Sequence, residues 1–115
     1  MATISSHILD SLNGLSASGI RVELFRLDGE ARTRLFDVSA GDEGRIVEAV
    51  DIGDAVSSRE YELIFHGGDY FARCHGLNSD AQRVVVLRFT MPEADKRYHM
   101  PIMLSPHSYS VWWSS

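Results

Sequence analysis

The chain has 115 residues, of which 44% are hydrophobic and 23% charged, and its formal net charge is −5. This length and composition predict one globular domain over residues 1–115, with a core that can form without disulfide or metal crosslinks. The negative charge argues against a general nucleic-acid binder, and the scattered basic residues argue against a protein that binds anionic membranes.

The first residues, MATISSHILDSLNG, contain no basic region followed by a long apolar core, so they do not resemble a secretory signal. No apolar run approaches the length needed to span a bilayer. Cys74 is the only cysteine, which excludes an intrachain disulfide. We therefore expect a cytoplasmic protein.

Alternating hydrophobicity predicts strands in the first half of the chain. Residues 19–27, GIRVELFRL, place Ile20, Val22 and Leu24 on one parity, as in a strand with one solvated face. Residues 28–34 read as a turn, and residues 35–40, LFDVSA, as a short second strand. The next segment, GDEGR, predicts a tight turn because glycine tolerates positive φ.

The second half continues the β pattern. Strands are predicted at the start of residues 60–71, over residues 82–91 and over residues 108–113, with about two turns of helix in residues 67–76. Residues 98–104 are expected to be extended, and Pro101 limits them to an edge strand or a bulge. Together these elements predict an all-β, antiparallel two-sheet sandwich with at most one short helix. Pairing of exposed edges favours a symmetric oligomer.

Composition and spacing alone do not define a catalytic site. The histidines, none of which forms a motif, are His7, His66, His75, His99 and His107. None of them has the helical spacing of a metal site, and Cys74 has only its sequence neighbour His75 beside it. We expect no metal and no cofactor, since no glycine-rich phosphate loop is found either.

Four segments resemble the 5-hydroxyisourate hydrolases, the transthyretin-related proteins. SSHILDSLNGLSASGIRVELFRL resembles their opening, which reads H-V-L-D and then a glycine before an alternating strand. GDEGRI resembles their D-x-x-G-R turn, and EYELIFHGGDYFAR their Y-x-L-x-F-x-x-x-x-Y-F segment. RYHMPIMLSPHSYS resembles their H-Y-H-V-P-L-L-L-S-P-x-x-Y-S block. The resemblance runs in order from His7 to Ser115.

The resemblance implies a transthyretin-like sandwich, assembled as a homotetramer of two dimers with active sites in a channel between the dimers. It implies a hydrolase that opens a ring amide of an oxidised purine during urate degradation. Carried over residue by residue, the catalytic set is His7, Arg45, His99 and the terminal Ser115. In such a site a histidine activates water and an arginine stabilises the charge that develops on the carbonyl oxygen.

The tail departs from the family pattern, which ends in Y-R-G-S. Here Trp112, Trp113 and Ser114 replace the tyrosine, arginine and glycine, and Arg97 replaces the first histidine of H-Y-H. We assign Trp112, Trp113 and Tyr109 to substrate binding, because an indole can stack on a flat ring although it cannot pair with a carboxylate. Strand alternation separates the two tryptophans, and we expect Trp113 to share the catalytic face with Ser115.

Two alternatives remain open for the altered tail. The chain could be a recruited paralogue that acts on another, more apolar cyclic compound. It could also be a non-catalytic ligand-binding protein, as transthyretin is. The histidines that are retained together favour an enzyme over a carrier, because a carrier has no need of them.

Overall fold

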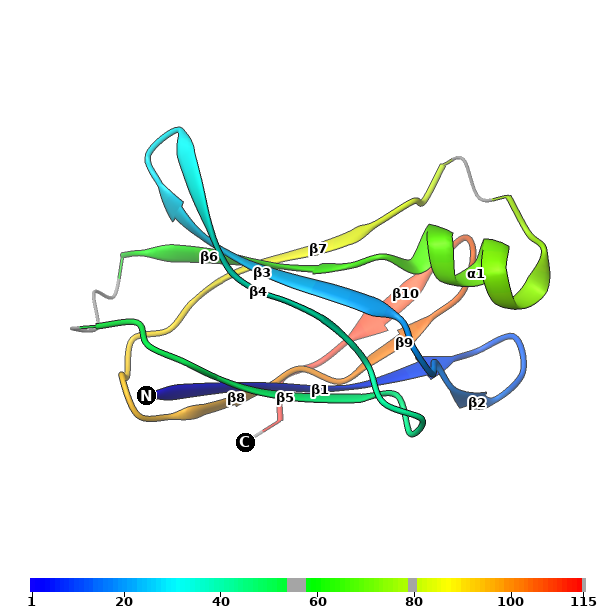
Figure 1. Cartoon of the computed structure of the whole chain (residues 1–115), viewed down its shortest axis with the longest axis horizontal. Coiled ribbons are helices and arrows are strands. Elements are labelled where there is room, and N and C mark those ends of the chain that lie inside the picture. Colours follow the sequence, from blue (N-terminus) through cyan, green and yellow to red (C-terminus); the bar gives the residue numbers. More distant parts are fainter. Residues whose placement is uncertain (54–57, 79–80, 115) are drawn as a thin grey trace.

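Two β-sheets lie face to face in the computed structural model, and one short helix lies at one end of them (Figure 1). The structure describes residues 1–53, 58–78 and 81–114. The strands are β1 (Ala2–Asp10), β2 (Leu15–Ser16), β3 (Arg21–Asp28), β4 (Ala31–Ser39), β5 (Arg45–Val50), β6 (Glu60–Phe65), β7 (Val85–Thr90), β8 (Arg97–His99), β9 (Ile102–Leu104) and β10 (Tyr109–Val111). The helix α1 spans Gly67–His75. Within the described ranges, no helix is long and apolar enough to cross a bilayer.

Strand β1 is the centre of the first sheet. On one side its first part pairs antiparallel with β5 and its last residues with β2. On the other side β8 and then β9 run parallel to it, and β10 pairs antiparallel with β9 at the edge. Strands β8 and β9 are separated at Met100 and Pro101, where proline has no N–H to donate to a ladder.

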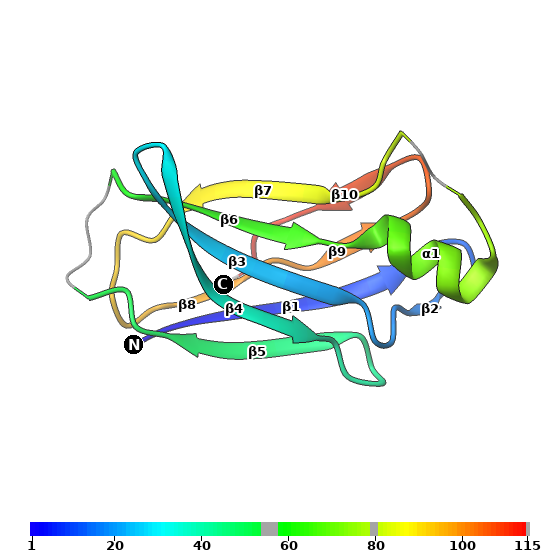
Figure 2. The same ribbon diagram turned by 45° about the horizontal axis from the view of Figure 1, so that its top comes forward.

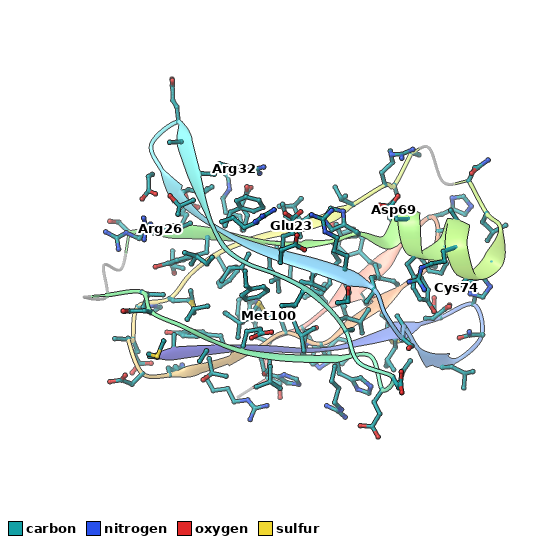
Figure 3. All side chains as sticks on the ribbon, viewed as in Figure 1. Glu23, Arg26, Arg32, Asp69, Cys74 and Met100 are labelled. Carbon is teal, nitrogen blue, oxygen red and sulfur yellow. The ribbon has the colours of Figure 1, made fainter. Side chains whose placement is uncertain are left out.

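The second sheet is antiparallel, in the order β4-β3-β6-β7 (Figure 2). The β3–β4 hairpin turns at Gly29, whose φ of 66° is in the left-handed region. Its outer face carries ion pairs, among them Arg21 with Asp37 at 2.8 Å, and Figure 3 shows Glu23, Arg26 and Arg32 along this sheet. Exposed pairs of this kind add little stability each, so this face is best described as solvated.

The core lies between the sheets and orients β1. Ile4, Ile8 and Leu24 are fully buried there, as is Met100, which Figure 3 shows between the two layers. Each such side chain contributes roughly 1.5–3 kcal/mol through burial. Because successive strand residues point to opposite faces, the even-numbered residues of β1 fill the core and the odd-numbered ones point outward.

The predicted sandwich with one short helix is confirmed, but several local features differ from the prediction. Residues 28–34 are not a turn throughout, since β4 begins at Ala31 and the turn is shorter than expected. The segment around Pro101 is broken as proline requires. Its second half, β9, lies between β1 and β10 and is not an edge, whereas its first half, β8, pairs with β1 and meets the tail at the single His99–Ser114 bridge. Strands β1 and β5 are not predicted. Buried polar residues such as Ser5 and Asp10 obscure the alternation in β1, and exposed apolar residues obscure it in β5. The parallel pairing of β1 with β8 and β9 also departs from a purely antiparallel sandwich.

Candidate active site

The outward face of β1 brings together three residues that are far apart in sequence. His7 is the register partner of Arg45 in β5, and Ser5 is the register partner of His99 in β8. Residues directly opposite each other point to the same face of a sheet. His7, Arg45 and His99 therefore share one face, which we call the catalytic face because the resemblance assigns these three residues to catalysis.

A glycine turn places Arg45 beside His7. Gly44 has a φ of 70°, and its carbonyl accepts a hydrogen bond of 2.7 Å from the N–H of Ile8. A Cβ at this position would meet the Ile8 carbonyl oxygen at 2.5 Å. Only glycine fits both requirements, so the turn fixes where β5 begins and hence which strand partner His7 receives.

The catalytic face carries positive charge without compensating carboxylates. Arg45 and Arg97 have no ion-pair partner in the part of the chain that the structure describes, whereas arginines of the other sheet such as Arg21 and Arg88 are paired. The chain as a whole has a net charge of −5. An unpaired cationic face on an acidic protein suits an anionic or oxygen-rich ligand.

The imidazole of His99 is partly buried and has defined partners. Its Nδ1 lies 2.8 Å from the hydroxyl of Ser5, and Arg97 Nε donates to the same hydroxyl at 3.2 Å. Burial, and then the positive charges of Arg97 and Arg45, hold the pKa of His99 below its ordinary value. His99 is therefore neutral at physiological pH, the form that general acid–base chemistry requires.

The tail joins this sheet as an ordered strand end. Tyr109, Ser110 and Val111 pair with β9, and Ser114 continues the same register as a bridge to His99, with its N–H donating to the His99 carbonyl at 3.0 Å. Ser115 lies outside the described residues. Its catalytic assignment stays a prediction.

The two tryptophans lie on opposite sides of the strand, as predicted, but it is Trp112 and not Trp113 whose register places it on the catalytic face. The register puts Trp112 on the catalytic face together with Ser114 and His99. Trp113 instead contacts Phe89 of the other sheet, with ring centroids 5.6 Å apart. The register therefore does not put Trp113 on the catalytic face, although its side chain lines a pocket at the sheet edge with Arg97 and Ser114. Its role in substrate binding stays a prediction. Tyr109 has the parity of Trp113 and is also not brought to this face.

The sequence does not predict two contacts of His99 and His7 that the structure contains. The Ser5 hydroxyl lies 2.8 Å from His99 Nδ1, and the Ser16 hydroxyl lies 3.5 Å from His7 Nε2. In the sequence Arg97 stands out only as a departure from the family pattern, and nothing there indicates its contact with Ser5. The available signal was parity, since Ser5 is two residues before His7 and Arg97 two residues before His99.

A second polar cluster lies away from this face and links β1 to α1. The fully buried Asp10 accepts hydrogen bonds from Tyr70 at 2.8 Å and His75 at 2.6 Å. Within the described ranges, no group of three or more His, Cys, Asp and Glu side chains is arranged to hold a metal ion. The Asp10 cluster is therefore read as a structural clamp.

Comparisons with known proteins agree with this fold. The model of the HIUase/Transthyretin family matches residues 4–113. The 5-hydroxyisourate hydrolase 2 of Rhizobium meliloti (strain 1021) is 36% identical over 111 residues, covering 95% of this chain and 92% of that protein. The solved Klebsiella pneumoniae 5-hydroxyisourate hydrolase superposes with a TM-score of 0.78 at 30% identity, covering 100% of both chains. Sea bream transthyretin, solved with thyroxine, gives a TM-score of 0.82 at 20% identity over 96% of this chain and 93% of that one, a likeness of fold.

Proposed function

The chain belongs to the HIUase/Transthyretin family, and on that footing we propose that it is a hydrolase that opens the ring amide of 5-hydroxyisourate in urate degradation. The observation that carries the proposal is the convergence of His7, Arg45 and His99 on one face from three different strands. The relatives named as 5-hydroxyisourate hydrolases, at 30% identity or more over nearly the whole chain, supply the substrate. We also propose that the protein is cytoplasmic, on the sequence features already given.

The chemistry follows from the groups on the catalytic face. One imidazole takes a proton from water as the water oxygen bonds to the amide carbon. The guanidinium of Arg45 and a donor from the second imidazole stabilise the charge on the carbonyl oxygen. The carbon–nitrogen bond then breaks, and the departing ring nitrogen takes up the proton. Ser115 is proposed to complete this set at the end of the tail, on the resemblance alone.

The direct test is turnover of freshly prepared 5-hydroxyisourate by the purified chain, followed by absorbance. The result expected is a decay faster than the spontaneous one and proportional to protein concentration. A decay equal to the uncatalysed rate, together with tight binding of aromatic ligands, contradicts the proposal and favours a non-catalytic ligand-binding protein. Turnover of a more apolar cyclic amide in preference to 5-hydroxyisourate favours the recruited paralogue, which the exposed Trp112 would suit.

The proposed assembly is a homotetramer made of two dimers. Strands β7 and β10 are sheet edges, and the catalytic face also bears the exposed apolar side chains of Val47, Met103 and Trp112. A second copy can extend the edges, and a second dimer can cover the face. We expect sedimentation equilibrium to give about four times the 12.9 kDa chain mass. A monomer at roughly micromolar concentration would contradict this assembly.

The two tryptophans should separate in their effects on binding and stability. Trp112→Ala should raise KM severalfold and change the free energy of unfolding little, because this ring lies on the catalytic face. Trp113→Ala should lower the free energy of unfolding by about 1 kcal/mol through the lost contact with Phe89, and should change KM less. Steady-state kinetics and urea unfolding of both variants measure the two quantities. If Trp113→Ala raises KM more than Trp112→Ala does, the assignment of faces is wrong.

A further inference from the structure

The hydroxyl of Ser5 joins Arg97 to His99. Ser5 is 1% exposed, and its Oγ lies 2.8 Å from His99 Nδ1 and 3.2 Å from Arg97 Nε. The three residues come from the neighbouring strands β1 and β8, where Ser5 is directly opposite His99 and Arg97 is opposite Thr3. Backbone pairing therefore puts the three side chains on one face, and the two hydrogen bonds of Ser5 Oγ connect them in the order Arg97, Ser5, His99.

The direction of these hydrogen bonds follows from counting donors. A guanidinium N–H can only donate, so the Ser5 oxygen accepts from Arg97. The hydroxyl has one proton of its own, and among the described residues the remaining partner of Oγ is His99 Nδ1. A buried hydroxyl proton without an acceptor costs roughly 1–3 kcal/mol. With Nδ1 as the acceptor of the Ser5 hydroxyl proton this cost is avoided, and in that arrangement Nδ1 carries no proton.

We propose that Arg97 and Ser5 are positioning residues that hold His99 as the Nε2–H tautomer, so that His99 donates a hydrogen bond to the substrate and His7 takes the proton from water. His99 cannot be the base in this arrangement, because Nε2 already carries a proton and Nδ1 is occupied by Ser5. This assignment of the donor role to His99 and the base role to His7 rests on the proposed function and deepens it.

The reaction balances with these roles. A water proton moves to a ring nitrogen of His7 while the water oxygen bonds to the amide carbon. The carbonyl oxygen gains the charge and accepts hydrogen bonds from His99 Nε2–H and Arg45. The carbon–nitrogen bond breaks, and the imidazolium of His7 returns the proton to the departing ring nitrogen, so no other reactant is consumed.

The surroundings of His99 keep it neutral. The charged and titratable groups that face it are Arg97 on its own strand, Arg45 on β5 and His7 on β1. The neighbouring tail residue Ser114 contributes a backbone N–H and no charge. Burial and these positive groups lower the pKa of His99 and outweigh a hydrogen bond with the Ser5 backbone that raises it, so removal of Arg97 should raise the pKa.

The tautomer can be measured without turnover. In long-range ¹H–¹⁵N spectra of histidine-labelled protein, assigned with His99→Gln, we expect an unprotonated Nδ1 and a protonated Nε2 for His99. Arg97→Met should raise the pKa of His99, because it removes a positive charge that lowers this pKa, whereas Arg88→Met, which removes a charge from the other sheet, should not. A protonated Nδ1 in the unaltered protein overturns the proposal.

The turnover rates of variants provide a second test of the proposal. Ser5→Ala should lower kcat about tenfold, while Ser6→Ala removes an equally buried hydroxyl that donates to the Met100 carbonyl and should leave kcat nearly unchanged. His99→Gln retains an N–H donor and should be about tenfold faster than His99→Ala. Equal rates for these two variants overturn the donor role. If 5-hydroxyisourate is not turned over although Nδ1 is unprotonated, the proposed function is wrong and the tautomer assignment stands.

Discussion

Replacing His7 by alanine should lower kcat for 5-hydroxyisourate by about a thousandfold, within the range that a positioned general base contributes. His7 is the imidazole whose register partner is Arg45, and Ser16 Oγ lies 3.5 Å from its Nε2, too far for a strong hydrogen bond. This side chain is therefore the one on the catalytic face that is free to take a proton. Steady-state assays at saturating substrate measure the loss.

The same variant permits a test by chemical rescue. Added imidazole should restore part of the turnover of His7→Ala, because a small base can occupy the space left by the side chain. His107→Ala is the matched control, since His107 is exposed in the loop between β9 and β10, and it should retain full activity. A His7→Ala enzyme that is as fast as the control would remove His7 from the mechanism.

The sequence predicts the sandwich because alternation is a local property. The alternation of Ile20, Val22 and Leu24 predicts β3 without reference to any partner strand. The sequence does not predict β5, because apolar residues such as Val47 lie on its exposed face and remove the alternation. The position of β5 depends instead on its pairing with β1. Local pattern therefore identifies strands with one clearly wet face and misses those whose outer face is itself apolar.

The sequence predicts which residues form the catalytic face but not how the strands arrange them. His7, Arg45 and His99 are assigned by resemblance, and the register of three strands is what brings them together. Alternation correctly separates Trp112 from Trp113, yet it cannot say which of them faces His99. That choice depends on the pairing of Ser114 with His99, a contact between chain segments that no local pattern encodes.

The clamp between β1 and α1 leads to the largest expected effect on stability. Asp10→Asn should lower the free energy of unfolding by about 3 kcal/mol, because it removes a buried charge that accepts from both Tyr70 and His75. Asp37→Asn is the matched control, since that carboxylate pairs with Arg21 at the surface and should cost at most about 1 kcal/mol. Urea unfolding at equal protomer concentration measures both.

The difference between Asp10→Asn and the unaltered protein should also depend on pH. Burial alone would raise the pKa of Asp10, but the hydrogen bonds from His75, Tyr70 and the Leu12 N–H outweigh it and leave the pKa below its ordinary value of 3.8. A carboxyl group with a lowered pKa in the folded state contributes its full stability above the pKa of the unfolded chain, and loses it as the pH falls through the folded value. The two proteins should therefore differ fully at about pH 7 and progressively less below about pH 4. A difference that is constant down to about pH 3 would mean that the ionised form of Asp10 is not what holds α1 against β1.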